Sequence, residues 1–310
     1  MDDQFLRLQL DLSPRRARLG GKSLSVRLRG FAERYNEVVA DNRLQAECSI
    51  DGQAAIGKRS AIWLGGRLEG RSYPDSAVRD FRRGTVLAGV VAPVPAGRLG
   101  LSVAFRGADF ARTPRRDRMS RALILEFARP LRRGLDLSSA AEFEWSRLGR
   151  PAIRKLAGCA PEYGGDQRDR SREIRLRVRY VRGWLWEAGF GWESLLSNSF
   201  GFSRGTKRFE GIVAGWLPAS IMLRARGRLE QTNYEDDDLG CIFVDAGSDP
   251  EAGEELSTIQ VRLRRRLRGA LALEGGLSGF RNESLLVGHY YAKWVTSVGL
   301  IWSPGDESAF

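Results

Sequence analysis

The stretch SREIRLRVRYVRGWLWEAGFGW, from Ser171 to Trp192, alternates arginine with apolar residues one position at a time. Successive side chains of a β-strand point to opposite faces of a sheet. A strand with this sequence therefore carries guanidinium groups on one face and apolar groups on the other. The turn at Arg182-Gly183 and the alternation behind it predict a hairpin with the same two faces.

The same pattern with a period of two recurs along the chain, whereas a helical period is not sustained over a comparable length. Leucines alternate with polar residues from Phe5 to Leu12, and apolar residues alternate with arginines from Ser23 to Glu33. Similar segments follow at 44–50, 135–145, 259–264 and 293–302. We therefore predict an all-β chain whose strands, at about 10 to 14 residues, exceed the roughly 5 or 6 typical of globular sheets.

The connections between these segments alternate between short and long. The short ones contain the Gly and Pro residues of tight turns, and lie at 93–97, 130–134, 182–183, 218–219 and 268–269. The long, polar ones lie at 70–84, 107–118, 147–170, 198–205, 234–256 and 281–288. A soluble sandwich has no reason to sort its connections this way. An up-and-down barrel that crosses an outer membrane has short turns at one end and long loops at the other.

A helical membrane protein is excluded, because no apolar stretch approaches the roughly 18 residues of a spanning helix. The longest, at 86–92, stops at Pro93. In lipid all backbone polar groups must be paired, which forces a spanning sheet to close. An arginine facing lipid at mid-depth would cost about 2–4 kcal/mol. We therefore predict that residues 1–310 form one transmembrane up-and-down antiparallel β-barrel, with apolar residues facing lipid and arginines facing the lumen.

The segments from Leu24 onward number about 14, with 12 and 16 as alternatives, and single-chain bacterial barrels have even strand numbers. Residues 1–22 are left over, although Phe5 to Leu12 has the pattern of a strand. This part is either a periplasmic or luminal segment that pairs locally, or an extra strand, in which case the intact barrel has 16. We favour 14, because an open sheet edge in lipid is costly.

The predicted lumen carries charges of both signs. Its lining is expected to consist of Arg27, Arg29, Arg67, Arg175, Arg177, Arg179, Arg224, Arg226, Arg228, Arg262, Arg264, Glu142, Glu144, Glu187 and Glu193, with Glu274 as a further acidic member. The whole chain has a net charge of +12, from 50 Lys and Arg against 38 Asp and Glu. The lining charges either pair into ladders that stiffen the wall or, in an open lumen, favour anions.

Aromatic residues fall near the ends of the predicted strands, where they can form the two girdles of a membrane barrel. The candidates for these interfacial positions are Tyr180, Trp184, Trp192, Trp216, Trp294 and Trp302, with Trp186 and Tyr290 as further members. The alternative is that they are ordinary strand aromatics in a soluble core.

The chain shows no catalytic or metal-binding signature, and we expect no enzyme activity, no cofactor and no metal. The one histidine, His289, forms no recognised arrangement with Ser284 and Asp306. The acidic run at 235–238, with Asp245, Asp249 and Glu251 behind it, could bind Ca²⁺ but lacks the spacing of an EF-hand loop.

The three cysteines show no metal-ligand spacing. We expect Cys48, Cys159 and Cys241 to be unpaired small residues. A disulfide between Cys159 and Cys241 stays open, provided that the compartment is oxidising.

The last segment, RGALALEGGLSGFRNESLLVGHYYAKWVTSVGLIW (Arg268 to Trp302), resembles the closing hairpin and last strand of bacterial outer-membrane β-barrels. The resemblance is closest to barrels that follow tetratricopeptide repeats, as in surface lipoprotein assembly modifiers. It implies no catalytic residues, and envelope proteins or a periplasmic repeat domain as partners. Such chains end in an aromatic within the last strand, a part that Trp302 or Phe310 would play here.

Two classes of function follow. The first is an outer-membrane barrel of a Gram-negative bacterium, in contact with outer-membrane lipid, that acts as a pore or as the membrane module of an export, assembly or envelope complex. The second is a soluble basic β protein that binds nucleic acid or polysaccharide. We favour the first because the arginines alternate along strands instead of clustering. The N-terminus Met1-Asp2-Asp3 shows no secretory signal, so the chain is either cytoplasmic or a mature or excised form.

Overall fold

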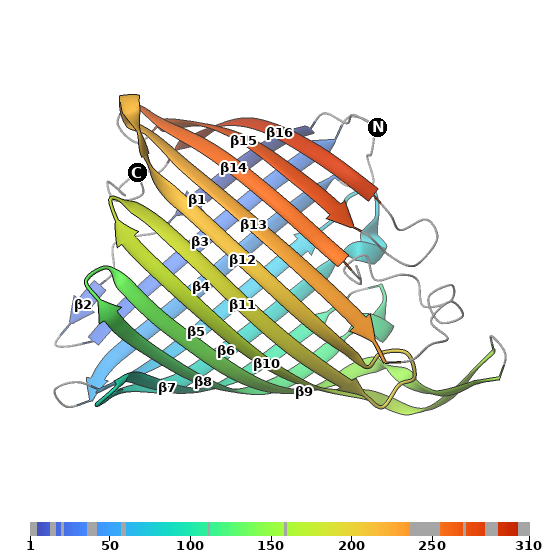
Figure 1. Ribbon diagram of the computed structural model, residues 1–310. Helices are drawn as coiled ribbons and strands as arrows, with labels where there is room; N and C mark the ends of the chain where they lie inside the picture. The colour runs from blue at the N-terminus through green and yellow to red at the C-terminus, as the bar shows by residue number, and fades with distance from the viewer. Residues whose placement is uncertain are drawn as a thin grey trace.

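The chain forms one antiparallel sheet that rolls up into a barrel (Figure 1). The computed structural model describes residues 5–12, 17–19, 22–35, 42–56, 60–110, 112–157, 160–235, 255–268, 271–282 and 291–302. Within these ranges no helix is long and apolar enough to cross a membrane. The short 3₁₀ helices are η2 (Ala77–Arg79), η3 (Pro114–Arg116) and η4 (Pro218–Ser220).

The strands follow one another along the sheet in the order of the sequence. They are β1 (Phe5–Leu12), β2 (Ala17–Leu19), β3 (Lys22–Tyr35), β4 (Arg43–Ile56), β5 (Ser60–Ser72), β6 (Phe81–Val94), β7 (Gly97–Asp109), β8 (Arg118–Arg132), β9 (Leu135–Ala157), β10 (Ala160–Arg182), β11 (Trp184–Ser197), β12 (Arg204–Leu217), β13 (Ile221–Tyr234), β14 (Glu255–Arg268), β15 (Leu271–Asn282) and β16 (Tyr291–Trp302). From β3 to β16 each strand pairs antiparallel with the next. These fourteen strands confirm the predicted all-β, up-and-down architecture and its strand number.

The N-terminal segment adds one further strand position to this sheet, beside β3. β1 pairs antiparallel with residues 28–35 of β3, and β2 pairs with residues 22–24 of the same strand. Residues 5–12 and 17–19 are thus paired as strands of this sheet, which is the alternative that the sequence analysis did not favour. Leu8 and Leu10 are exposed and register with Ala32 and Gly30, so they extend the face that the apolar residues of β3 occupy.

With β1 added to the fourteen strands from β3 to β16, the sheet has an odd number of strand positions. β1 and β16 therefore run parallel where the two ends of the sheet meet. The two strands lie next to each other (Figure 1). They are nevertheless the two ends of the hydrogen-bonded path, and within the described residues no ladder joins them. We call this junction the seam. A pocket with a volume of about 1370 Å³ has Leu8, Leu10, Val298 and Leu300 in its wall and extends from the seam across β3 to β7.

The connections are sorted between the two ends of the barrel, as alternation of strand direction requires. The segments at 73–80, 110–117 and 198–203 share one end, which we call the long-connection end. The turns at 95–96, 133–134, 183 and 218–220 lie at the opposite, short-connection end. The short turns use Gly134 and Gly183 at positive φ, 78° and 71°, where a residue with a Cβ would be strained.

The segment 147–170 is a correction to the sequence analysis, which predicted a long polar loop there. It is instead the far part of a hairpin, because β9 and β10 are each 23 residues long and stay paired up to Ala157 and Ala160. This hairpin projects beyond the barrel wall (Figure 1). Register shifts at 162–168 absorb its irregular pairing.

Two of the long connections close in the same way. The Asp80 carboxylate accepts a hydrogen bond from the backbone N–H of Tyr73 at 2.6 Å, and Asp117 accepts one from Phe110 at 2.8 Å. The rings of Phe81 and Phe110 lie 5.6 Å apart between their centroids. These connections are therefore folded onto the barrel end.

Candidate functional site

Charged side chains line the concave face of the sheet. A cavity of about 490 Å³ has in its wall Arg67 of β5, Arg106 of β7, Glu142 of β9 and Glu193 of β11. Strands this far apart in the sheet can share a cavity only on its concave side. Because paired residues of neighbouring strands share a face, the registers extend this inner face to every strand.

The inner face carries a continuous chain of opposite charges. Arg106 Nη1 lies 2.6 Å from Glu142 Oε1 and also pairs with Glu144. Arg118 Nη2 lies 2.6 Å from Glu144 Oε1. From β9 the chain continues to Arg175 of β10, whose Nη2 is 3.2 Å from Glu142 Oε2. Strands β7 to β10 are thus joined by side chains as well as by the backbone ladder.

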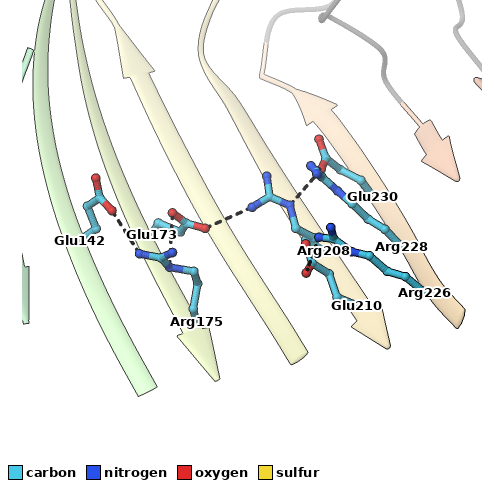
Figure 2. A network of polar contacts seen from close by, with 8 residues as sticks. All are labelled: Glu142, Glu173, Arg175, Arg208, Glu210, Arg226, Arg228 and Glu230. Carbon is cyan, nitrogen blue, oxygen red and sulfur yellow. Dashed lines mark hydrogen bonds and ion pairs between the residues drawn. The ribbon is translucent and has the colours of Figure 1, made fainter. Parts of the chain in front are cut away.

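Arg208 of β12 extends this chain in both directions (Figure 2). Its Nη1 lies 3.3 Å from Glu173 Oε1 of β10, and its Nε lies 3.0 Å from Glu230 Oε2 of β13. Arg228 of β13 pairs with the same Glu230. Arg226 Nη2 lies 3.2 Å from Glu210 Oε2 in the neighbouring strand. We call the connected pairs from Arg106 to Arg228 the inner-face network.

Smaller clusters pair on other strands of the same face. Arg67 of β5 lies 2.8 Å from Glu47 and 3.7 Å from Glu69. Glu274 of β15 pairs with Arg264 at 2.7 Å and with Arg262 at 3.7 Å. Partners on neighbouring strands dominate throughout. The charges therefore act as side-chain ladders along the wall.

The predicted lining residues divide into paired and unpaired groups. Those with an ion pair are Arg67, Arg175, Arg177, Arg226, Arg228, Arg262, Arg264, Glu142, Glu144 and Glu187, the last with Arg177 at 3.2 Å. Arg27 and Arg29 lie on the same face of β3. Among the described residues Arg179 and Arg224 make no ion pair. That these side chains line a water-filled lumen stays a prediction.

The sequence analysis missed five members of the inner-face network: Arg106, Arg118, Arg208, Glu173 and Glu230. The signal was present, because Glu173 has the same parity as Arg175, and Arg106 follows the alternating Leu101, Val103 and Phe105. What the sequence could not show is which of these residues meet.

The outer face exposes apolar side chains along the strands. Leu176 is 44% exposed, Leu263 44% and Val298 78%. The registers place Leu176 beside Phe190 and Leu263 beside Leu223, so the apolar residues form continuous rows across neighbouring strands.

The predicted aromatic positions fall on both faces. By strand register Tyr180, Trp184, Trp192 and Trp294 share the outer face. Trp216 is a correction, because it has the parity of Arg208 and Glu210 and lies on the inner face at the short-connection end. The side chain of Trp302 and all of Tyr290 lie outside the described residues.

Several other expectations also fall outside them: His289, Ser284, Asp306, Phe310, the cysteines Cys159 and Cys241, and the acidic run beyond Glu235. Cys48 is unpaired and half-buried. Within the described ranges no group of His, Cys, Asp and Glu side chains is arranged to hold a metal ion.

No protein-family model matches the chain, and no curated protein matches it. Solved structures with a similar course of the chain include the siderophore receptor PirA from Pseudomonas aeruginosa, 13% identical, with a TM-score of 0.43, covering 99% of this chain and 59% of the receptor. CdiB from Acinetobacter baumannii is 9% identical, with a TM-score of 0.49, over 96% of this chain and 59% of CdiB. OmpT of Vibrio cholerae is 8% identical, with a TM-score of 0.47, over 92% of this chain and 97% of OmpT.

The chain therefore spans 59% of the length of the first two of these proteins. Likenesses this distant carry no argument about activity. The barrel assignment rests on the sheet topology. The function depends on the apolar outer face and the charged inner face of the sheet.

Proposed function

We propose that the chain is an outer-membrane β-barrel that acts as a pore, with an inner wall held by Arg–Glu ladders. One observation carries this proposal: apolar side chains are exposed on the outer face while the ladders lie on the inner face. An apolar surface that extends over many strands is far larger than a soluble monomer leaves in water. Lipid can cover it along β4 to β15, because each of these strands pairs with a neighbour on both sides.

A preference for anions follows from the arginines of the inner face that form no ion pair. Arg179 and Arg224 make no ion pair among the described residues, although Arg179 is in register with Glu187 and Asp136. Arg224 also registers directly with Arg262, so two arginines share one face at the same level on adjacent strands. Both positions lie toward the short-connection end of their strands. An open lumen would therefore have an excess of positive potential at this end.

The alternative is a barrel that serves as the membrane module of an export, assembly or envelope complex. The resemblance of Arg268 to Trp302 to the barrels behind tetratricopeptide repeats favours it. Such a module needs no open lumen, so it predicts a correctly assembled barrel that does not conduct.

The test is reconstitution of the protein from detergent into a planar lipid bilayer. We expect detergent to be required for solubility, stepwise conductance, and a reversal potential in a salt gradient with the sign of anion selectivity. A folded barrel without conductance would contradict the pore and support the membrane module. A protein that stays monodisperse without detergent would contradict both.

A further inference from the structure

A cluster of arginines lies on the outer face, away from the inner-face network. Arg121 of β8 and Arg170 of β10 flank Trp145 of β9, since Trp145 registers with both. Two residues further toward the short-connection end, Arg172 registers with Phe143. Two residues in the other direction, Arg147 registers with Arg168. We call Arg121, Arg147, Arg168, Arg170 and Arg172 the outer arginine cluster.

The cluster occupies one level on three neighbouring strands. On β10, Arg168, Arg170 and Arg172 precede the outward apolar residues Ile174 and Leu176, so they lie on the side of the long-connection end. The other two strands have the same order. Arg121 precedes Leu123 on β8, and Arg147 follows Trp145 on β9, which runs in the opposite direction. The arginines therefore border the apolar surface on its long-connection side.

These guanidinium groups are exposed and largely without counter-charges. Arg147 pairs with Asp166 at 2.6 Å, with a side-chain exposure of 68%. Within the described residues Arg121, Arg168, Arg170 and Arg172 have no ion pair. Four unneutralised arginines side by side repel one another. This arrangement is stabilised when an external anion binds, and guanidinium groups bind phosphate through paired hydrogen bonds.

The spacing favours a ligand with more than one phosphate. Arg121 and Arg170 are two strands apart, which is roughly 10 Å at the usual strand spacing. Trp145 lies between them, 42% exposed, and Phe143 and Leu123 continue the apolar surface below. A nucleic acid or an acidic protein would leave this adjoining apolar surface uncovered, whereas the acyl chains of a lipid would cover it.

We propose that the outer arginine cluster binds the phosphates of lipid A, the multiply acylated, diphosphorylated glycolipid of the outer leaflet. Its acyl chains lie along the outward apolar residues of β8 to β10. The proposal rests on the outer-membrane location proposed above, and it assigns the long-connection end to the cell exterior.

The experiment measures binding of diphosphoryl lipid A to the detergent-solubilised protein by native mass spectrometry. The variant is Arg121→Gln/Arg170→Gln/Arg172→Gln, which removes three charges and keeps polar, unbranched side chains. We expect its Kd to rise at least ~10-fold, since three of the cationic groups that attract an anionic headgroup are removed. The matched control is Arg129→Gln, on the same face of β8 at the short-connection end, which should bind as the unchanged protein does.

Equal binding by the triple variant and the unchanged protein would overturn the proposal. Binding of phosphatidylglycerol, with one phosphate, as tightly as diphosphoryl lipid A would overturn the assignment to lipid A. Both comparisons are made on protein that runs as a folded, heat-modifiable band, so misfolding of a variant is seen directly. A barrel that conducts but binds lipid A independently of these arginines refutes this inference alone, whereas a protein soluble without detergent refutes the proposed function.

Discussion

Arg208 of β12 reaches across β11 to Glu173 of β10, with 3.3 Å between Arg208 Nη1 and Glu173 Oε1. The strand between them presents Gly191 at this point, in register with both Arg175 and Arg208. A Cβ on Gly191 would lie 3.6 Å from Arg208 Cβ and 3.9 Å from Glu173 Oε1. The glycine thus leaves the space through which the two charges meet.

Substitutions at Gly191 test this relationship. We expect Gly191→Ala to be tolerated, because its Cβ makes ordinary van der Waals contacts. Gly191→Leu should push Arg208 and Glu173 apart and lower the free energy of unfolding by roughly 1 kcal/mol, since both groups are partly solvated. Urea unfolding in detergent measures the difference. Equal stability of the two variants would show that the ion pair across β11 contributes nothing.

The two faces of β10 should tolerate opposite substitutions. Leu176→Arg places a charge on the outer face and should impair membrane assembly, at a cost of about 2–4 kcal/mol at mid-depth. Arg177→Gln removes only the pair with Glu187, a contact of 3.2 Å whose arginine is 55% exposed, and should assemble normally. Heat-modifiable migration of the folded band in isolated outer membranes reports assembly. Equal tolerance at both positions would count against a lipid-facing outer surface.

Anion preference should depend on the two unpaired arginines. Arg179→Glu/Arg224→Glu should shift the reversal potential in a salt gradient toward zero or to the cation side. Arg179→Lys/Arg224→Lys keeps the charge and should conduct like the unchanged protein. The effect should shrink in concentrated salt, because the Debye length falls from about 10 Å at 0.1 M to about 3 Å at 1 M. An unchanged reversal potential in the glutamate variant would remove these residues from the selectivity mechanism.

The seam should be the least protected part of the sheet. Among the described residues β16 pairs with β15 only, whereas β10 pairs with β9 and β11. Amide hydrogens in 291–302 should therefore exchange with deuterium faster than those in 171–182. The segment 271–282, paired on both sides, serves as the comparison at the same part of the barrel. Protection of 291–302 equal to that of 171–182 would mean that a hydrogen-bonded ladder closes β1 onto β16.

The partners of individual charges could not be predicted from the sequence. Arg208 and Glu173 are 35 positions apart and belong to strands that are not neighbours. Their contact depends on the registers of three strands, on the curvature of the sheet and on the missing side chain at Gly191. Each of these depends on where the other strands lie, which no local pattern encodes.

The outer arginine cluster could not be predicted from the sequence either, because its residues meet only through strand pairing. The residues at 147–170 mix charged side chains with glycines, prolines and isolated apolar residues, so they show no sustained alternation and predict a loop. The continued pairing of β9 with β10 places Arg147 and Arg168 level with each other on the outer face. Trp216 was misplaced likewise, since its face depends on strand parity and not on its nearness to a turn.

The sequence by itself determined the two-faced strands, their order and the fourteen strands from β3 to β16, because side-chain alternation with a period of two is a local property of an extended backbone. Only the tertiary structure decided that β1 adds a fifteenth strand position beside β3, so that β1 and β16 run parallel at the seam with no ladder between them in the described part of the chain. Closure of a sheet brings together its first and last strands, and whether their backbones can pair depends on the direction and stagger of every strand between them.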